Sequence, residues 1–248
     1  MIVFNYQLII EYDGTKFVGW QAQKSGISIQ GEIQKILKRF LKTDIKLLGS
    51  GRTDSGVHAL GQSANFLINY KIDKKKLLTT LNHFLKKKKI SILSIKNKKL
   101  DFHSRYSAKE RRYLYIIYNR EAPLSLYKDK AWHVRKKLNI HLIKLGAKIL
   151  SGKHNFSAYR SSSCSAKSPV RTLKKILVKK KKDGRIIFTF ISQSFLQQQV
   201  RSMVGCLKIL GEEKWDIDRF KKPLFSKKRF YCAPPAPPSG LYLQNVKY

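Results

Sequence analysis

The chain has few acidic residues, few cysteines and no long hydrophobic run. Only 15 Asp and Glu stand against 52 Lys and Arg, which gives a net charge of +37 at pH 7. Such an excess attracts phosphates and makes their binding depend steeply on salt. A lysine-biased composition spread over solvated faces would produce the same lysine runs, so a single lysine is no evidence of a contact. The summed charge favours nucleic acid as the partner.

The scarcity of cysteine argues against two kinds of structural support. Cys164, Cys206 and Cys232 lie far apart, with no histidine at zinc-ligand spacing. We therefore expect neither a disulfide framework nor a metal site, and we expect the protein to work in a reducing compartment. No apolar run approaches the roughly 20 residues of a membrane span. Strand-like sequence begins at about Tyr6, too early for a signal peptide to precede it. We expect a cytoplasmic protein without contact to a membrane.

Hydrophobic periodicity predicts two halves with the same order of elements. In the first half we expect a strand at 7–12, a helix at 28–41, strands at 45–48 and 64–70, a helix at 73–85 and a strand at 90–95. The second half has the corresponding elements at 113–118, 140–150 (helix), 171–178, 185–191, 196–207 (helix) and 241–246. This β-α-β-β-α-β order is the ferredoxin-like pattern.

The predicted fold is therefore α+β, with two tandem ferredoxin-like units. We place the boundary between 1–105 and 106–248, and expect a mixed, mainly antiparallel sheet with an active-site cleft between the units. The Pro-rich segment 233–239 must be an irregular connection. Because the repeat is one of element order and not of residues, it supports the architecture more than any boundary.

A single carboxylate in a glycine-flanked loop is the most informative local feature. The run Gly51-Arg-Thr-Asp-Ser-Gly-Val-His-Ala-Leu60 places Asp54 between two glycines. Glycine lets the backbone turn sharply, which can present Asp54 as a nucleophile, a base or a charge stabiliser. An Asp-Ser-Gly triplet is also common in plain turns. An aspartic protease would need a second carboxylate sharing the proton, and Arg52 favours an ionised Asp54 instead.

The longer run resembles a known family. Gly49-Ser-Gly-Arg-Thr-Asp-Ser-Gly-Val-His-Ala-Leu-Gly-Gln62 is similar to the signature of the tRNA pseudouridine synthase A family. Further similar segments follow in the family's order across nearly the whole chain: Ile10-Glu-Tyr-Asp-Gly14, Gly19-Trp-Gln21, Phe102-His-Ser-Arg-Tyr-Ser-Ala108, Arg111-Arg-Tyr-Leu-Tyr115, Phe195-Leu196, Val200-Arg201, Val204-Gly205 and Gly240-Leu-Tyr-Leu243.

The resemblance implies a pseudouridine synthase fold and an enzyme that isomerises uridine to pseudouridine at positions 38, 39 and 40 in the anticodon stem-loop of tRNA. It implies no cofactor and no metal, tRNA as the partner, and a homodimer. Asp54 would be the nucleophile. Two readings stay open: the same chemistry at other tRNA positions or on messenger RNA, and a catalytically silent RNA-binding protein. The strands lack the aromatic pattern of an RNA-recognition motif.

The resemblance also implies roles for four other residues. Tyr113 would stack on the uracil and assist removal of the C5 proton, although a core tyrosine fits its strand equally well. Arg201 would pair with Asp54, since an arginine on an apolar helical face needs a charge partner. Arg52 would fill the duplex space left by the flipped nucleotide, or contact a phosphate. Leu243 would form an apolar wall beside Tyr113.

His58 and Trp20 are expected to be structural, and two further sites depart from the family pattern. His58 follows the loop at the start of a strand, where a satisfied hydrogen bond is the simpler interpretation. Trp20 is expected to pack the loop rather than to stack on RNA. Gln197 to Gln199 depart from the family, which often carries histidine there, and glutamine cannot titrate. Tyr106 replaces a common phenylalanine, a minor change.

Overall fold

The computed structural model describes residues 2–248 and divides into two compact units. The first unit contains the chain up to Lys109 together with Tyr242–Tyr248, and the second contains Glu110–Leu241. From the sequence we placed the terminal strand in the second half. It lies instead with the first unit, because strand pairing joins segments that are distant in sequence.

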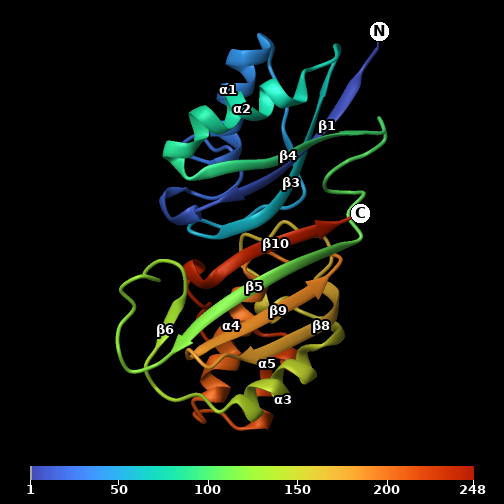
Figure 1. The fold of residues 1–248 in the computed structure, drawn as a ribbon. Coiled ribbons are helices and arrows are strands. Elements are labelled where there is room, and N and C mark those ends of the chain that lie inside the picture. The colour runs from blue at the N-terminus through green and yellow to red at the C-terminus, as the bar shows by residue number, and fades with distance from the viewer. Residues whose placement is uncertain (1) are drawn as a thin grey trace. The chain divides into compact units, whose positions relative to one another are not determined.

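The first unit follows the element order expected for its half (Figure 1). Its elements are β1 (Phe4–Tyr12), α1 (Ile29–Leu41), β2 (Leu48–Gly49), β3 (His58–Ile68), α2 (Lys74–Leu85), β4 (Ile90–Lys98) and β10 (Leu241–Lys247). Strands pair in the order β4-β1-β3-β10, with β2 also on β3, and all of these pairs are antiparallel except β3 with β10. The first unit is therefore built on a mixed, mainly antiparallel arrangement.

The helices of the first unit begin at polar side chains and bury one apolar face. The Ser28 hydroxyl accepts a hydrogen bond from Gly31 N, and the Asp73 carboxylate accepts from Lys75 N and Lys76 N. Both contacts satisfy amide groups that a helix start leaves unpaired. The buried side chains recur at helical spacing: Ile29, Ile33, Leu37 and Leu41 on α1, and Leu77, Leu81 and Leu85 on α2. The two helices pack together (Figure 1).

The second unit contains more elements than we expected. They are β5 (Glu110–Asn119), β6 (Trp132–Val134), α3 (Ile140–Leu150), β7 (Gly152–Asn155), β8 (Val170–Lys180), β9 (Arg185–Ser192), α4 (Gln199–Gly211) and α5 (Ile217–Ser226). Strands pair in the order β5-β9-β8-β7, all antiparallel, and β6 joins β5 in parallel. The elements β6, β7 and α5 were not predicted. The strands β6 and β7 have only three and four residues, too few to show an alternating pattern.

The chain as described is thus α+β, with five α-helices and mixed strand pairing among residues 2–248. The core of the second unit contains buried side chains from β9 and α4. Among them are Phe188 and Phe190 on β9 and Met203 and Leu207 on α4. None of the helices among residues 2–248 combines the length and the apolar composition that crossing a membrane requires.

Candidate active site

Asp54 lies in a loop without regular secondary structure between β2 and β3. The residue is half-buried, while Arg52 and Ser55 are exposed. Val57 N donates a hydrogen bond to Asp54 O at 3.2 Å, which closes a tight turn. Gly56 adopts a φ of +76° in this turn, a conformation that side chains disfavour. Gly56, two residues after Asp54, is therefore favoured by the turn, and Asp54 itself stays half-buried.

The segment Gly14–Trp20 supports this loop on both sides of Asp54. Before it, Trp20 N donates to Thr53 O at 3.1 Å. After it, Phe17 O accepts from Gly56 N at 3.3 Å and from the Ser55 hydroxyl at 3.1 Å. Gly19 permits this approach, because a Cβ atom there would lie 2.6 Å from Thr53 O. Hydrogen bonds at the residues on either side of Asp54 thus hold a loop that has no strand of its own.

His58 has the structural role that we expected. Its side chain is 1% exposed, and its Nδ1 accepts a hydrogen bond from Gly14 N at 3.0 Å. The same Nδ1 lies 3.2 Å from Asp13 Oδ1, so the ring is held between the Gly14 amide and the Asp13 carboxylate. The ring stacks on Tyr242 with centroids 4.7 Å apart. Burial raises the pKa of Tyr242, and the negative charge of Asp13 adds to the effect.

Trp20 packs inside the first unit. It is 1% exposed, and a Cβ atom at Gly49 would lie 2.4 Å from its indole Nε1. Gly49 therefore lies directly against the indole, and the expectation that Trp20 packs the loop rather than stacking on RNA is confirmed.

Arg201 projects from α4 in the second unit and is tied to the Pro-rich connection. Its Nε donates to Ala236 O at 2.8 Å, and Ala236 N donates to Arg201 O at 2.9 Å. Gly205, one turn further along α4, allows close contact, since a Cβ atom there would lie 2.1 Å from Pro234 O. The predicted irregular connection is therefore a docked segment that restricts the Arg201 side chain at its Nε.

Tyr115 holds the same connection from β5. Its hydroxyl donates to Pro237 O at 2.8 Å. Burial raises the pKa of Tyr115 well above its ordinary value, and the positive charge of Arg201 opposes that rise. The guanidinium and this hydroxyl therefore share one environment in the second unit.

Tyr113 and Leu243 are largely buried. Tyr113 on β5 is 9% exposed, and its ring meets Phe195 edge to face with centroids 5.1 Å apart. Leu243 on β10 is fully buried and lies opposite Ala59 of β3. Asp54, Arg52 and Leu243 belong to the first unit, and Tyr113 and Arg201 to the second. The Asp54–Arg201 ion pair and the wall that Leu243 would form beside Tyr113 stay predictions.

Apart from Trp20, residues 14–19 were missed as the support of the Asp54 loop. The sequence showed Gly14 and Gly19 in segments similar to the family's opening, yet glycine in a turn is too common to indicate what packs against it. The need for glycine at positions 14 and 19 is explained only by the folded positions of Val57 O and Thr53 O. A Cβ atom at Gly14 would lie 2.0 Å from Val57 O.

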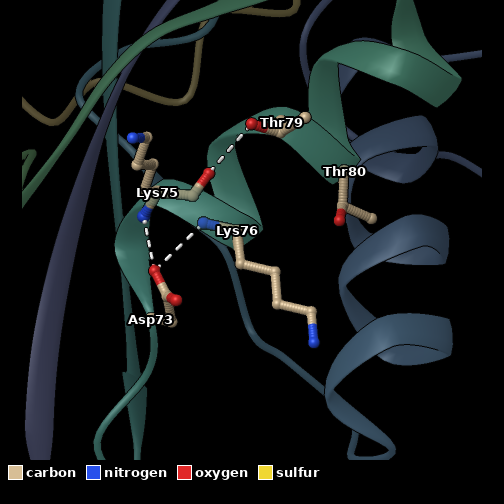
Figure 2. Close-up of a pocket in the computed structure, with 5 residues that line it drawn as sticks. All are labelled: Asp73, Lys75, Lys76, Thr79 and Thr80. Atoms are coloured by element: carbon tan, nitrogen blue, oxygen red, sulfur yellow. Dashed lines mark hydrogen bonds between the residues drawn. The ribbon is translucent and has the colours of Figure 1, made fainter.

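A depression of about 310 Å³ lies at the start of α2, away from the Asp54 loop in sequence (Figure 2). Asp73, Lys75, Lys76, Thr79 and Thr80 line it. The Asp73 carboxylate is occupied in capping the helix, as the dashed lines in Figure 2 show. None of the predicted site residues lines this depression. Elsewhere in residues 2–248, no three His, Cys, Asp or Glu side chains converge as a metal site would need.

Comparison with known proteins identifies the family. The family model described as tRNA pseudouridine synthase matches residues 8–107 and 147–248, which include the Asp54 loop, Arg201 and Leu243. The tRNA pseudouridine synthase A of Pelagibacter ubique is 56% identical over 99% of this chain and 100% of its own length. The protein of that name from Parvibaculum lavamentivorans is 42% identical, over 98% of each chain.

A solved structure of a Cbf5-Nop10-Gar1 complex contains a chain that aligns with 82% of this one and 53% of itself. Its TM-score of 0.33 and identity of 11% are too low to carry an argument. The family model and the curated relatives are sufficient without it. With both matched segments covering most of the sequence, the chain belongs to the tRNA pseudouridine synthase family.

Proposed function

We propose that this enzyme isomerises uridine to pseudouridine at positions 38, 39 and 40 of the tRNA anticodon stem-loop, with Asp54 as its nucleophile. Membership of the tRNA pseudouridine synthase family supplies the reaction and the class of RNA. The observation that carries the proposal for Asp54 is its presentation: a half-buried carboxylate on a turn whose neighbouring residues are hydrogen-bonded to residues 17 and 20.

The reaction asks for one carboxylate and no redox step. The C1′–N1 bond of uridine breaks, the base turns, C5 bonds to C1′, and the C5 proton leaves for N1. Asp54 can form a transient ester with C1′ or an adduct at C6 and then leave again. In a third route the carboxylate removes the ribose 2′ proton and a glycal forms. All three routes need an ionised Asp54 in contact with the nucleoside.

The other assigned residues act around that carboxylate. Arg201 would pair with Asp54 and keep it anionic, and Tyr113 would stack on the uracil. Arg52 would occupy the space of the flipped nucleotide, since a base inside a duplex must leave the stack to be modified. The fold that we propose places these residues in two ferredoxin-like units. The protein would act as a homodimer in the cytoplasm. Light scattering of the purified protein would measure whether it is a dimer.

The test compares wild type with Asp54→Asn on an unmodified tRNA transcript, mapping pseudouridine by carbodiimide-blocked primer extension. We expect product at 38, 39 and 40 with wild type and none with Asp54→Asn. The affinity for tRNA should change little, because one charge is removed from a large contact area. Asp101→Asn is the matched control: it removes an exposed carboxylate outside the loop and should keep full activity.

Each part of the proposal can fail separately. Full activity of Asp54→Asn would reject Asp54 as the nucleophile. Transcripts in which uridines 38, 39 and 40 are replaced one at a time by cytidine identify the target. Product that persists elsewhere when all three are replaced would assign the enzyme to other positions. Binding without product in wild type would indicate a silent RNA-binding protein.

A further inference from the structure

We propose that Tyr12 is a positioning residue for Asp54 and acts through the hydroxyl of Thr53. Tyr12 Oη and Thr53 Oγ1 share a hydrogen bond of 2.8 Å. Both residues are buried, with Tyr12 3% and Thr53 6% exposed. The inference rests on the proposed role of Asp54 as the nucleophile, because Thr53 is the residue immediately before it.

Tyr12 is a firm anchor because it is the last residue of β1 and is paired on both sides. It lies opposite Ala59 of β3 and opposite Ile90 of β4. The register of β1 with β3 shifts by one residue between Ile10 and Tyr12. Such irregularities re-aim the side chains near them and are common beside active sites. The Tyr12 hydroxyl thereby connects the sheet to the loop.

Thr53 is where the loop needs an anchor. It lies in the stretch between β2 and β3 that has no strand or helix hydrogen bonds. Its carbonyl accepts from Trp20 N, and its hydroxyl bonds to Tyr12. The residue is therefore held through its backbone by one segment and through its side chain by another. Two attachments to different elements restrict both the position and the rotation of the peptide that leads into Asp54.

The consequence for catalysis is geometric. A displacement of about 1 Å in a reacting group can cost about a hundredfold in rate, even when the altered residue does not touch the substrate. Because Tyr12 is buried, loss of its hydroxyl should not alter contacts with tRNA. A positioning role therefore predicts a change in kcat and not in KM.

The decisive variant is Tyr12→Phe, which removes one oxygen atom and keeps the ring. We expect kcat for pseudouridine formation to fall about tenfold, with KM for tRNA unchanged. Tyr6→Phe is the matched control, since Tyr6 lies on the same strand, is fully buried and accepts a hydrogen bond from Ile72 N at 2.9 Å. That variant should lower the melting temperature and leave kcat at the wild-type value.

The partner hydroxyl provides a second arm. Thr53→Ser keeps the oxygen and should retain most of kcat, whereas Thr53→Val keeps the shape and should lose as much as Tyr12→Phe. The double variant Tyr12→Phe with Thr53→Val should be no slower than the worse single variant, because the two substitutions remove one interaction.

Three results would overturn the inference: wild-type kcat in Tyr12→Phe, an effect on KM alone, or equal loss in Thr53→Ser and Thr53→Val. Asp54→Asn is assayed beside these variants. If that variant retains activity, the proposed nucleophile is wrong. If it is inactive while Tyr12→Phe is as fast as wild type, only the positioning role is rejected.

Discussion

Arg52 shows how a single exposed side chain is oriented before any substrate binds. Its Nε donates to Gln21 Oε1 at 3.1 Å, and Gln21 Nε2 donates to Gln30 Oε1 at 2.9 Å. Gln30 Nε2 in turn donates to Leu47 O at 2.8 Å. The Arg52 guanidinium can only donate, so Gln21 must accept through Oε1 and donate through Nε2. The same reasoning then fixes the orientation of the Gln30 amide. This chain limits the freedom of the guanidinium and reduces the entropy that Arg52 would lose on entering an RNA stack.

At the residue scale we expect Arg52→Ala to lower kcat/KM on folded tRNA by about ten- to a hundredfold, because flipping a base costs a few kcal/mol. Steady-state kinetics on a transcript measures the loss. Arg39→Ala, on the exposed face of α1, removes the same charge and should have little effect. An equal loss in both variants, confined to KM, would assign Arg52 to a phosphate contact instead.

Helix α1 depends on a buried carboxylate as well as on its apolar face. Glu32, in its first turn, is 5% exposed and lies 3.1 Å from Lys35 Nζ. The ammonium group of Lys88, from the turn after α2, also contacts it. Burial alone would raise the pKa of Glu32, but hydrogen bonds and attraction from Lys88 and Lys35 outweigh burial, so the pKa is lowered. The carboxylate thus joins α1 to the segment that leads into β4.

At the element scale we expect Glu32→Gln to reduce the free energy of unfolding at neutral pH by about 1–2 kcal/mol. Since the native pKa is lower than the unfolded value of about 4.3, the stabilisation is complete above that value and disappears as the pH falls through the native pKa. Thermal unfolding from pH 7 to pH 3 should therefore show the two curves converging in acid. Glu121→Gln, whose partner Arg135 is exposed, should match wild type throughout. A difference independent of pH would contradict this account.

The whole molecule carries a charge of +37. We expect this summed charge to determine the affinity for RNA more than any single residue does. Several lysines are used internally, such as Lys208 with Glu212 at 2.7 Å. These pairs account for few of the 52 basic residues, because the chain has only 15 acidic ones. Most of the positive charge therefore remains available to phosphates.

At the scale of the molecule we expect log Kd for tRNA to rise linearly with log salt concentration. Neutralising 6–10 phosphates predicts a loss of about 10³–10⁵ in affinity between about 50 and 200 mM salt. Filter binding with Asp54→Asn, which we expect to leave the substrate unconverted, measures the slope. A flat response would mean that the excess charge does not touch the RNA.

Local features were predicted well where the residues themselves carry the signal. The Ser28 cap, the helix that begins after Asp73 and the turn at Asp54 all follow from short-range hydrogen bonding. The helix expected from Leu196 begins only at Gln199, because Gln198 adopts a left-handed conformation with φ of +61°. Of the strand expected at 45–48, only Leu48 is a strand residue, in β2, which pairs with Asn65 and Ala64 of β3.

The sequence by itself determined the family, the Asp54 loop and the order of elements in the first half, because a motif and a hydrophobic period are properties of neighbouring residues. Tertiary structure alone decided which distant segments meet: β10 beside β3, the Pro-rich connection on α4, and residues 12–20 around the loop. Such pairings depend on complementary shape and on hydrogen-bonding groups that any backbone offers. Two glycines and a tyrosine hydroxyl acquire a function only when the chain has folded and placed Thr53 and Val57 against them.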